Sequence, residues 1–278
     1  MSNITVSSHH AMSTWWQVRV AGEDEAYSAQ AAHAAFAITD HMEALMSRFR
    51  EQSEISILGS LAKGERYKPS GPVFDCLVLA EKCQKATRGA FDVCASARAQ
   101  GEDPRWFLDH NTREFVSDCG GCRIDLGAIA KGYTLDQMAQ ELGIWGCEKF
   151  LLMSSGSSIL AGSAPEGEEG WRVRLGDHPD AVEVTLAHRG LGTSGNALRG
   201  DHILDPFTGR TANRYQRSWA FADSAAEADA LSTAWMNMDW DEITRFCEDH
   251  SKAGAAILDR EGKTRFTGGT VLMKSAFP

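Results

Sequence analysis

The segment Ile124-Asp-Leu-Gly-Ala-Ile-Ala-Lys-Gly-Tyr133 joins a strand-like stretch to the start of a helix-like one. The strand side delivers Asp125, small residues follow, and Lys131 and Gly132 fall in the opening turn of the helix. Small residues let backbone groups approach a ligand closely, and a helix N-terminus with a nearby lysine favours a phosphate group. The spacing excludes a Walker A loop. An ordinary strand-to-helix turn with a surface lysine is the alternative interpretation.

A second candidate site lies further along the chain, in Glu227-Ala-Asp-Ala-Leu-Ser-Thr-Ala234. Asp229 and Thr233 are four residues apart, so they share one face near the start of a predicted helix. A carboxylate with a hydroxyl or carbonyl oxygen matches the ligand chemistry of Mg²⁺, which keeps waters and binds substrate phosphates. In the alternative interpretation, Asp229 complements the helix dipole and Thr233 packs.

A polar cluster follows the glycine-rich stretch Gly192-Thr-Ser-Gly195, in Asp201-His-Ile-Leu-Asp-Pro-Phe-Thr-Gly209. His202 has the chemistry of a general acid or base, and Asp205 that of a group that orients a neighbour. The same residues are good turn formers, so a purely structural turn is the alternative.

Cysteine usage points to reduced thiols. The chain has seven cysteines, an odd and scattered set that does not suggest a disulfide framework. Cys119-Gly-Gly-Cys122 is half of a zinc or redox motif, but neither a second CxxC nor an HxxxH accompanies it. We therefore favour a structural role for it, at the turn of a predicted hairpin.

Hydrophobic spacing outlines a mixed order of helices and strands. Helices are predicted near residues 25–49, 72–87 and 134–142, from 224 onward, and over 241–250. Strands are predicted at 15–20, 149–153, 171–175, 182–186 and 219–222, with hairpins over 113–127 and 255–269. Residues 50–56 are expected to form a loop, and His9-His10 a frayed terminus. Because strands and helices do not alternate strictly, the order favours an α+β fold over a doubly wound sheet.

Composition narrows the functional class. Of 278 residues, 43% are hydrophobic and 24% charged, which is ordinary for a globular protein. The net charge of −10, without a cluster of lysine and arginine, argues against binding to nucleic acid or anionic lipid. No apolar run approaches the ~18 residues of a membrane span, and no signal peptide is recognisable. We expect a cytoplasmic protein.

Taken in order, these motifs resemble the FAD:protein FMN transferase family, the ApbE-like flavin transferases. The resemblance begins at Ala11-Met-Ser-Thr14, where the family has Met-Gly-Thr, and covers nearly the whole chain. It continues through Met46-Ser-Arg-Phe49, Ser53-Glu-Ile-Ser56, Gly89-Ala-Phe-Asp-Val93, Asp125 to Tyr133, Thr193-Ser-Gly195, His202 to Gly209 and Ala228 to Ala234. Any one of these motifs is weak, whereas the ordered set is specific.

The resemblance implies the fold and the reaction. We expect one ApbE-like α+β domain over residues 1–278, with mixed or antiparallel sheets and flanking helices that form two intertwined lobes around FAD. The family transfers FMN from FAD to a Ser or Thr hydroxyl of a partner flavoprotein, with Mg²⁺ at the pyrophosphate, and releases AMP.

The resemblance also implies roles for individual residues. It places FAD against Met12, Phe49, Ala90, Phe91, Asp92, Asp125, Lys131 and Leu204. It assigns the metal to Asp229, Thr233 and the backbone carbonyl of Ala128, and catalysis to His202. Two alternatives stay open: a Mg²⁺-dependent FAD pyrophosphatase that gives FMN and AMP to water, and a non-catalytic FAD-binding protein.

Overall fold

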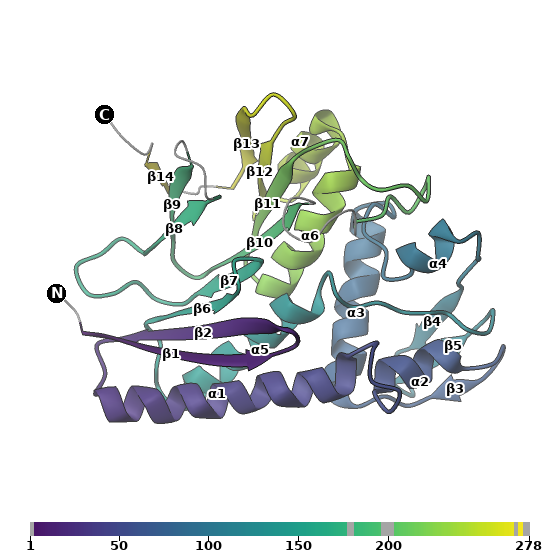
Figure 1. The fold of residues 1–278 in the computed structure, drawn as a ribbon, viewed down its shortest axis with the longest axis horizontal. Coiled ribbons are helices and arrows are strands. Elements are labelled where there is room, and N and C mark those ends of the chain that lie inside the picture. Colours follow the sequence, from purple (N-terminus) through teal and green to yellow (C-terminus); the bar gives the residue numbers. More distant parts are fainter. Residues whose placement is uncertain (1–2, 177–180, 196–202, 270–271, 275–278) are drawn as a thin grey trace.

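The computed structural model describes residues 3–176, 181–195, 203–269 and 272–274. The described strands form one large sheet with the order β1-β2-β6-β7-β10-β11-β12-β13, in which every pairing is antiparallel (Figure 1). Its strands are β1 Ile4–Ala11, β2 Thr14–Ala21, β6 Phe150–Ser154, β7 Ser158–Ala161, β10 Arg189–Gly195, β11 Arg217–Ala222, β12 Gly254–Leu258 and β13 Thr264–Gly268.

Alternating side chains give the large sheet two apolar faces. On one face lie the helices α1 Glu25–Met46, α5 Ala130–Ile144 and α6 Ala225–Asn237, with Leu152 buried among α1 and α5. The neighbouring Leu151 points to the opposite face, which packs against β8 Trp171–Leu175 and β9 Val182–Leu186. These two strands form a smaller antiparallel sheet with β14, Leu272–Lys274. The α+β class with antiparallel sheets is confirmed.

A second group of elements lies to the side of α6 (Figure 1). It comprises α2 Glu54–Ser60, β3 Arg66–Tyr67, α3 Gly71–Ala86, α4 Ala95–Ala99, β4 Trp106–Asp109 and β5 Glu114–Ser117. Buried side chains of α2 and α3 share one hydrophobic cluster with α6 and with α7, Trp240–Asp249. Helix α6 therefore packs against the large sheet and against this second group of elements. No helix in the described ranges has the length and apolarity that a membrane span requires.

Glycine lets α6 lie directly on the large sheet. A Cβ atom at Gly192 of β10 would sit 2.2 Å from the carbonyl oxygen of Ala228. A Cβ at Gly132 of α5 would lie equally close, 2.2 Å, to the carbonyl oxygen of Ala225, where α6 begins. Real side chains do not tolerate such distances, so these two glycines set the spacing of α5, α6 and the sheet.

The predicted hairpin over residues 113–127 is wrong. Strand β5 pairs with β3 and β4, and residues 121–126 form no strand. Both edges of β5 are already occupied, so the chain after Cys122 turns away and bonds elsewhere: the Asp125 N–H donates to the carbonyl of Val93 at 2.8 Å. The hairpin of β12 and β13, by contrast, is confirmed.

Three local expectations need correction. His9 and His10 lie in β1, which pairs with β2, so this terminus is not frayed. The segment predicted as a loop enters α2 at Glu54, because the Ser53 side chain accepts a hydrogen bond from the Ser56 N–H and so caps the helix. Helix α1 ends at Met46, which leaves Phe49 beyond its end.

Candidate active site

A cavity of about 510 Å³ is lined by residues of the large sheet and its helices and by residues of the second group of elements. The family resemblance assigned roles to twelve residues, and ten of them line the cavity: Met12, Phe49, Ala90, Asp92, Asp125, Ala128, Lys131, Leu204, Asp229 and Thr233. Phe91 is not brought to it, because its ring is buried in the core at 1% exposure. His202 lies outside the described residues, although its neighbours Ile203 and Leu204 line the cavity.

Asp229 is a deeply buried charged group of the cavity, at 3% exposure. Its Oδ2 atom accepts from the backbone N–H of Gly132 at 3.0 Å, and its Oδ1 atom accepts from the Ser158 hydroxyl, also at 3.0 Å. Both donors are neutral, and no lysine, arginine or histidine of the described ranges forms an ion pair with this carboxylate. A buried carboxylate without a cationic partner is a favourable place for a cation to bind.

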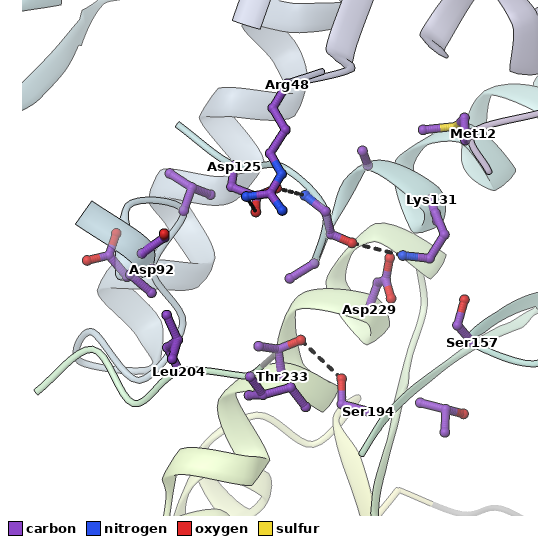
Figure 2. Close-up of a pocket in the computed structure, with 18 of the residues that line it drawn as sticks. Met12, Arg48, Asp92, Asp125, Lys131, Ser157, Ser194, Leu204, Asp229 and Thr233 are labelled. Atoms are coloured by element: carbon purple, nitrogen blue, oxygen red, sulfur yellow. Dashed lines mark hydrogen bonds and ion pairs between the residues drawn. The ribbon is translucent and has the colours of Figure 1, made fainter. Parts of the chain in front are cut away.

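Thr233 lies one helical turn after Asp229 on α6, as its spacing predicted. Its hydroxyl is 3.1 Å from the hydroxyl of Ser194 on β10 (Figure 2). Ala128 lines the same cavity in the loop before α5. Carboxylate, hydroxyl and carbonyl oxygens are hard donors, and Mg²⁺ is commonly bound by one or two carboxylates together with substrate phosphates. The residues present therefore fit a magnesium ion.

Lys131 stands in the first turn of α5, where the positive end of the helix dipole favours negative charge. Its Nζ atom donates to the carbonyl oxygen of Gly127 at 2.8 Å. Figure 2 shows Lys131 and Thr233 on either side of Asp229 in this view. Positive charge and hydrogen-bond donors thus adjoin the oxygen donors in one cavity.

Arg48 is a cavity residue to which the sequence motifs assigned no role. Its Nη1 atom lies 3.0 Å from Oδ2 of Asp125, whose Oδ1 atom accepts from the Gly127 N–H at 2.9 Å. The two side chains remain 48% and 35% exposed, so the pair adds little to stability. The guanidinium also lies over the ring of Phe49, at 4.7 Å from its centroid, and Phe49 is 82% exposed at the cavity.

Asn237 is a second residue missed from the sequence. It lies one turn beyond Thr233 on α6 and donates through Nδ2 to the carbonyls of Ala90, at 3.0 Å, and Leu204, at 3.3 Å. It therefore joins two cavity segments that are far apart in the sequence. Its Oδ1 atom is buried and has no partner within the described part of the chain. The helical spacing Asp229, Thr233, Asn237 was the available signal.

Asp92 has a structural partner in the cavity wall. Its Oδ2 atom lies 2.5 Å from Nε of Arg98, and its Oδ1 atom accepts from the Cys94 N–H at 2.8 Å. Its side chain is only 3% exposed. These bonds fix the turn between α3 and α4 on which Ala90 also lies.

Met12 occupies the strained tip of the hairpin between β1 and β2. Met12 and Ser13 have φ angles of 50° and 57°, in the left-handed region that favours glycine or asparagine. The Met12 N–H donates to Oε2 of Glu43 at 2.9 Å, which helps hold the turn at the cavity. Non-glycine residues in this region cluster at functional sites.

The family model described as "ApbE family" matches residues 12–258. The chain belongs to the ApbE family. Similar curated ApbE relatives include the FAD:protein FMN transferase of Klebsiella pneumoniae (strain 342), which is 25% identical over 276 residues, covering 84% of this chain and 79% of that protein. The FAD:protein FMN transferase of Escherichia coli (strain K12) is 22% identical, covering 84% of this chain and 78% of that protein.

Solved ApbE structures share the fold. The flavin transferase ApbE from Vibrio cholerae matches 97% of this chain and 98% of its own with a TM-score of 0.84, at 18% sequence identity. The ApbE protein from Thermotoga maritima matches 95% of this chain and 97% of its own with a TM-score of 0.81, at 20% identity.

Proposed function

We propose that this chain is an FAD:protein FMN transferase, which moves FMN from FAD to a Ser or Thr hydroxyl of a partner flavoprotein and releases AMP. Membership of the ApbE family and the names of the curated relatives support this function. The observation that carries it is the cavity in which Lys131, Asp229 and Thr233 meet where α5 and α6 pack together.

In the proposed reaction one phosphorus–oxygen bond forms and another breaks. The acceptor oxygen bonds to the phosphorus of FMN, the phosphoanhydride bond to AMP breaks, and the hydroxyl proton leaves. Lys131 and the positive end of the α5 dipole would stabilise the negative charge that develops on the diphosphate. A fixed charge and oriented dipoles need no reorganisation during the reaction, so they lower the barrier.

Asp229, Thr233 and the Ala128 carbonyl are the proposed magnesium ligands. A bound Mg²⁺ would neutralise phosphate charge and orient the phosphoanhydride. The bonds of Asp229 to Gly132 and Ser158 hold its carboxylate in one orientation, with lone pairs left for a cation.

The rest of the cavity would bind the dinucleotide. Met12, Phe49, Ala90, Asp125 and Leu204 offer apolar and polar contacts for FAD. We propose that Phe91 and Asp92 act indirectly, because Phe91 anchors the turn in the core and Asp92 is paired with Arg98.

We propose His202 as the base that takes the proton from the acceptor hydroxyl. Support comes from its position next to Ile203 and Leu204, which line the cavity. An imidazole titrates near neutral pH and suits this role.

Two wider proposals accompany this function. Cavity residues come from segments between Met12 and Asn237, which supports one functional domain over 1–278.

All seven cysteines are free thiols, which supports a reducing, cytoplasmic setting.

One assay tests the function. The chain is incubated with FAD, Mg²⁺ and a candidate acceptor flavoprotein, and covalent flavin, free FMN and AMP are measured, with the acceptor's Ser/Thr→Ala variant as the matched control. Covalent flavin on the acceptor but not on its variant, with equal AMP, supports transfer. Free FMN and AMP alone would identify a pyrophosphatase, and unchanged FAD would identify a binding protein.

A further inference from the structure

The bend that follows β5 brings two cysteine sulfurs together. Gly120 and Gly121 have φ angles of 84° and 67°, so two successive left-handed residues reverse the chain between Cys119 and Cys122. The two Sγ atoms lie 3.2 Å apart. Because a disulfide bond is about 2.0 Å long, the sulfurs need to approach by only about 1.2 Å to form one.

The backbone of Arg105 holds both sulfurs in place. Its N–H donates to Sγ of Cys119 at 3.2 Å, and its carbonyl accepts from Sγ of Cys122 at 3.3 Å. Cys122 is fully buried, and burial raises the pKa of its thiol to about 11. Cys119 is half-buried, with the exposed Gly120 and Gly121 beside it, so it is the sulfur that a reagent can reach.

The other cysteines provide an internal comparison. Cys76, Cys83, Cys94, Cys147 and Cys247 are each at most 5% exposed. In the described residues, which include every cysteine, Cys119 and Cys122 form the one pair whose sulfurs are in contact. Arrangement and access therefore single out this pair.

We propose that Cys119 and Cys122 are a redox modification site, at which the two thiols form a reversible disulfide with each other. The oxidant is a low-molecular-weight disulfide of the glutathione type. The Cys119 thiolate attacks one sulfur of the oxidant, which gives a mixed disulfide and one released thiol. Cys122 then gives up its proton and attacks Sγ of Cys119, which releases the second thiol. Two protein thiols and one small disulfide become one protein disulfide and two small thiols, so electrons and protons balance.

The site is coupled to the cavity wall through the backbone. The Cys122 carbonyl accepts from Sγ of Cys94 at 3.2 Å, and three residues later the Asp125 N–H bonds to Val93. Asp125 and Val93 both line the cavity. A disulfide at the bend would thus restrain the segment that carries Asp125, whatever reaction the cavity performs.

The test measures the thiols of the folded, full-length chain. The protein is treated with a chelator, equilibrated over a series of reduced-to-oxidised glutathione ratios, quenched with acid, unfolded, alkylated and digested with trypsin. Cleavage after Arg113 and Arg123 releases Glu114–Arg123, which contains Cys119 and Cys122 and no other cysteine. A synthetic peptide of the same sequence serves as the unfolded reference.

As the glutathione ratio becomes oxidising, we expect this peptide to escape alkylation and to have a mass two hydrogens below that of the reduced, unalkylated peptide. Both changes should revert on reduction. The folded chain should reach half-oxidation at a ratio several-fold more reducing than the free peptide, because the sulfurs are already adjacent. The peptide with Cys147 should remain alkylated throughout. Cys122→Ser should accumulate a glutathione adduct on Cys119, whereas Cys119→Ser should leave Cys122 unmodified.

Four results would overturn the proposal, and the wild-type measurement stands even if a variant fails to fold. The first is that both cysteines stay alkylated across the series, and the second is that oxidation of the folded chain is no easier than that of the free peptide. The third is a stable glutathione adduct that persists on Cys119 of the wild type. The fourth is one zinc ion per chain in the untreated protein, whose removal by the chelator is what exposes these thiols.

Discussion

The carboxylate of Asp229 on α6 accepts a hydrogen bond from the N–H of Gly132, in the first turn of α5, at 3.0 Å. The return contact comes from Asp136 of α5, whose two oxygens accept from the N–H groups of Ala225 and Ala226 at 2.8 and 2.9 Å, where α6 begins. Each helix therefore satisfies the free N–H groups of the other. Only the Asp229 side of this exchange faces the cavity.

This reciprocal capping provides a matched pair of variants that test the proposed magnesium site. Asp229→Asn should lower Mg²⁺-dependent turnover at least about 100-fold, because a neutral amide is a poor ligand for Mg²⁺. Asp136→Asn removes a comparable helix cap without touching the cavity, so turnover per folded molecule should stay near the wild-type value. Mg²⁺ titrations of both variants, with folded fractions from thermal melts, make the comparison. An unchanged Mg²⁺ curve for Asp229→Asn would remove this residue from the site.

Asp136 should also give stability a defined pH dependence. Burial raises its pKa from 3.8 to about 6, although bonds from Ala226 and Ala225 act in the opposite direction. Between these values the folded chain binds the proton more tightly than the unfolded chain, so this contribution is present below about pH 4 and lost as pH rises through 6. The free energy of unfolding of the wild type, minus that of Asp136→Asn, should fall by on the order of 2–3 kcal/mol from pH 4 to 6.5 and then level off. Urea unfolding at a series of pH values measures it, and a rise over that range would contradict the assigned shift.

The hairpin tip tests whether strain is stored beside the cavity. Ser13→Gly should stabilise the chain by about 0.5–1 kcal/mol, because glycine adopts the φ of 57° found there without the steric cost of a Cβ atom. Ser8→Gly, in the middle of β1, is the control and should destabilise by a similar amount. Differential scanning calorimetry would show the two melting temperatures moving in opposite directions. A lower melting temperature for Ser13→Gly would mean that the Ser13 side chain supports the turn.

Substitution of His202 distinguishes a catalytic role of this residue from a role in FAD binding. His202→Ala should keep FAD affinity within a few-fold and lower transfer by about 10²–10⁴-fold, the usual contribution of a general base. The measurements are FAD fluorescence quenching and the rate of covalent flavin incorporation. Loss of affinity with an unchanged rate per bound FAD would instead make His202 a binding residue.

Local periodicity was sufficient for the parts of the site that lie on one element. Asp229 and Thr233 were predicted to share a face because a helix repeats every 3.6 residues, and they do. Lys131 was predicted in the opening turn of a helix, and α5 begins at Ala130. The order of the motifs along the chain was enough to indicate the family, which the match over residues 12–258 confirms.

Contacts between distant segments were decided only by the tertiary structure. The hairpin over 113–127 failed because β5 takes β3 and β4 as partners, and strand pairing is set by packing across the whole fold. The pairing of Arg48 with Asp125 and the two bonds of Asn237 join residues 33 or more positions apart, at which no helix or strand periodicity acts. The same reason explains Phe91: apolarity predicted burial, but only the packed structure decided that its ring faces the core and not the cavity.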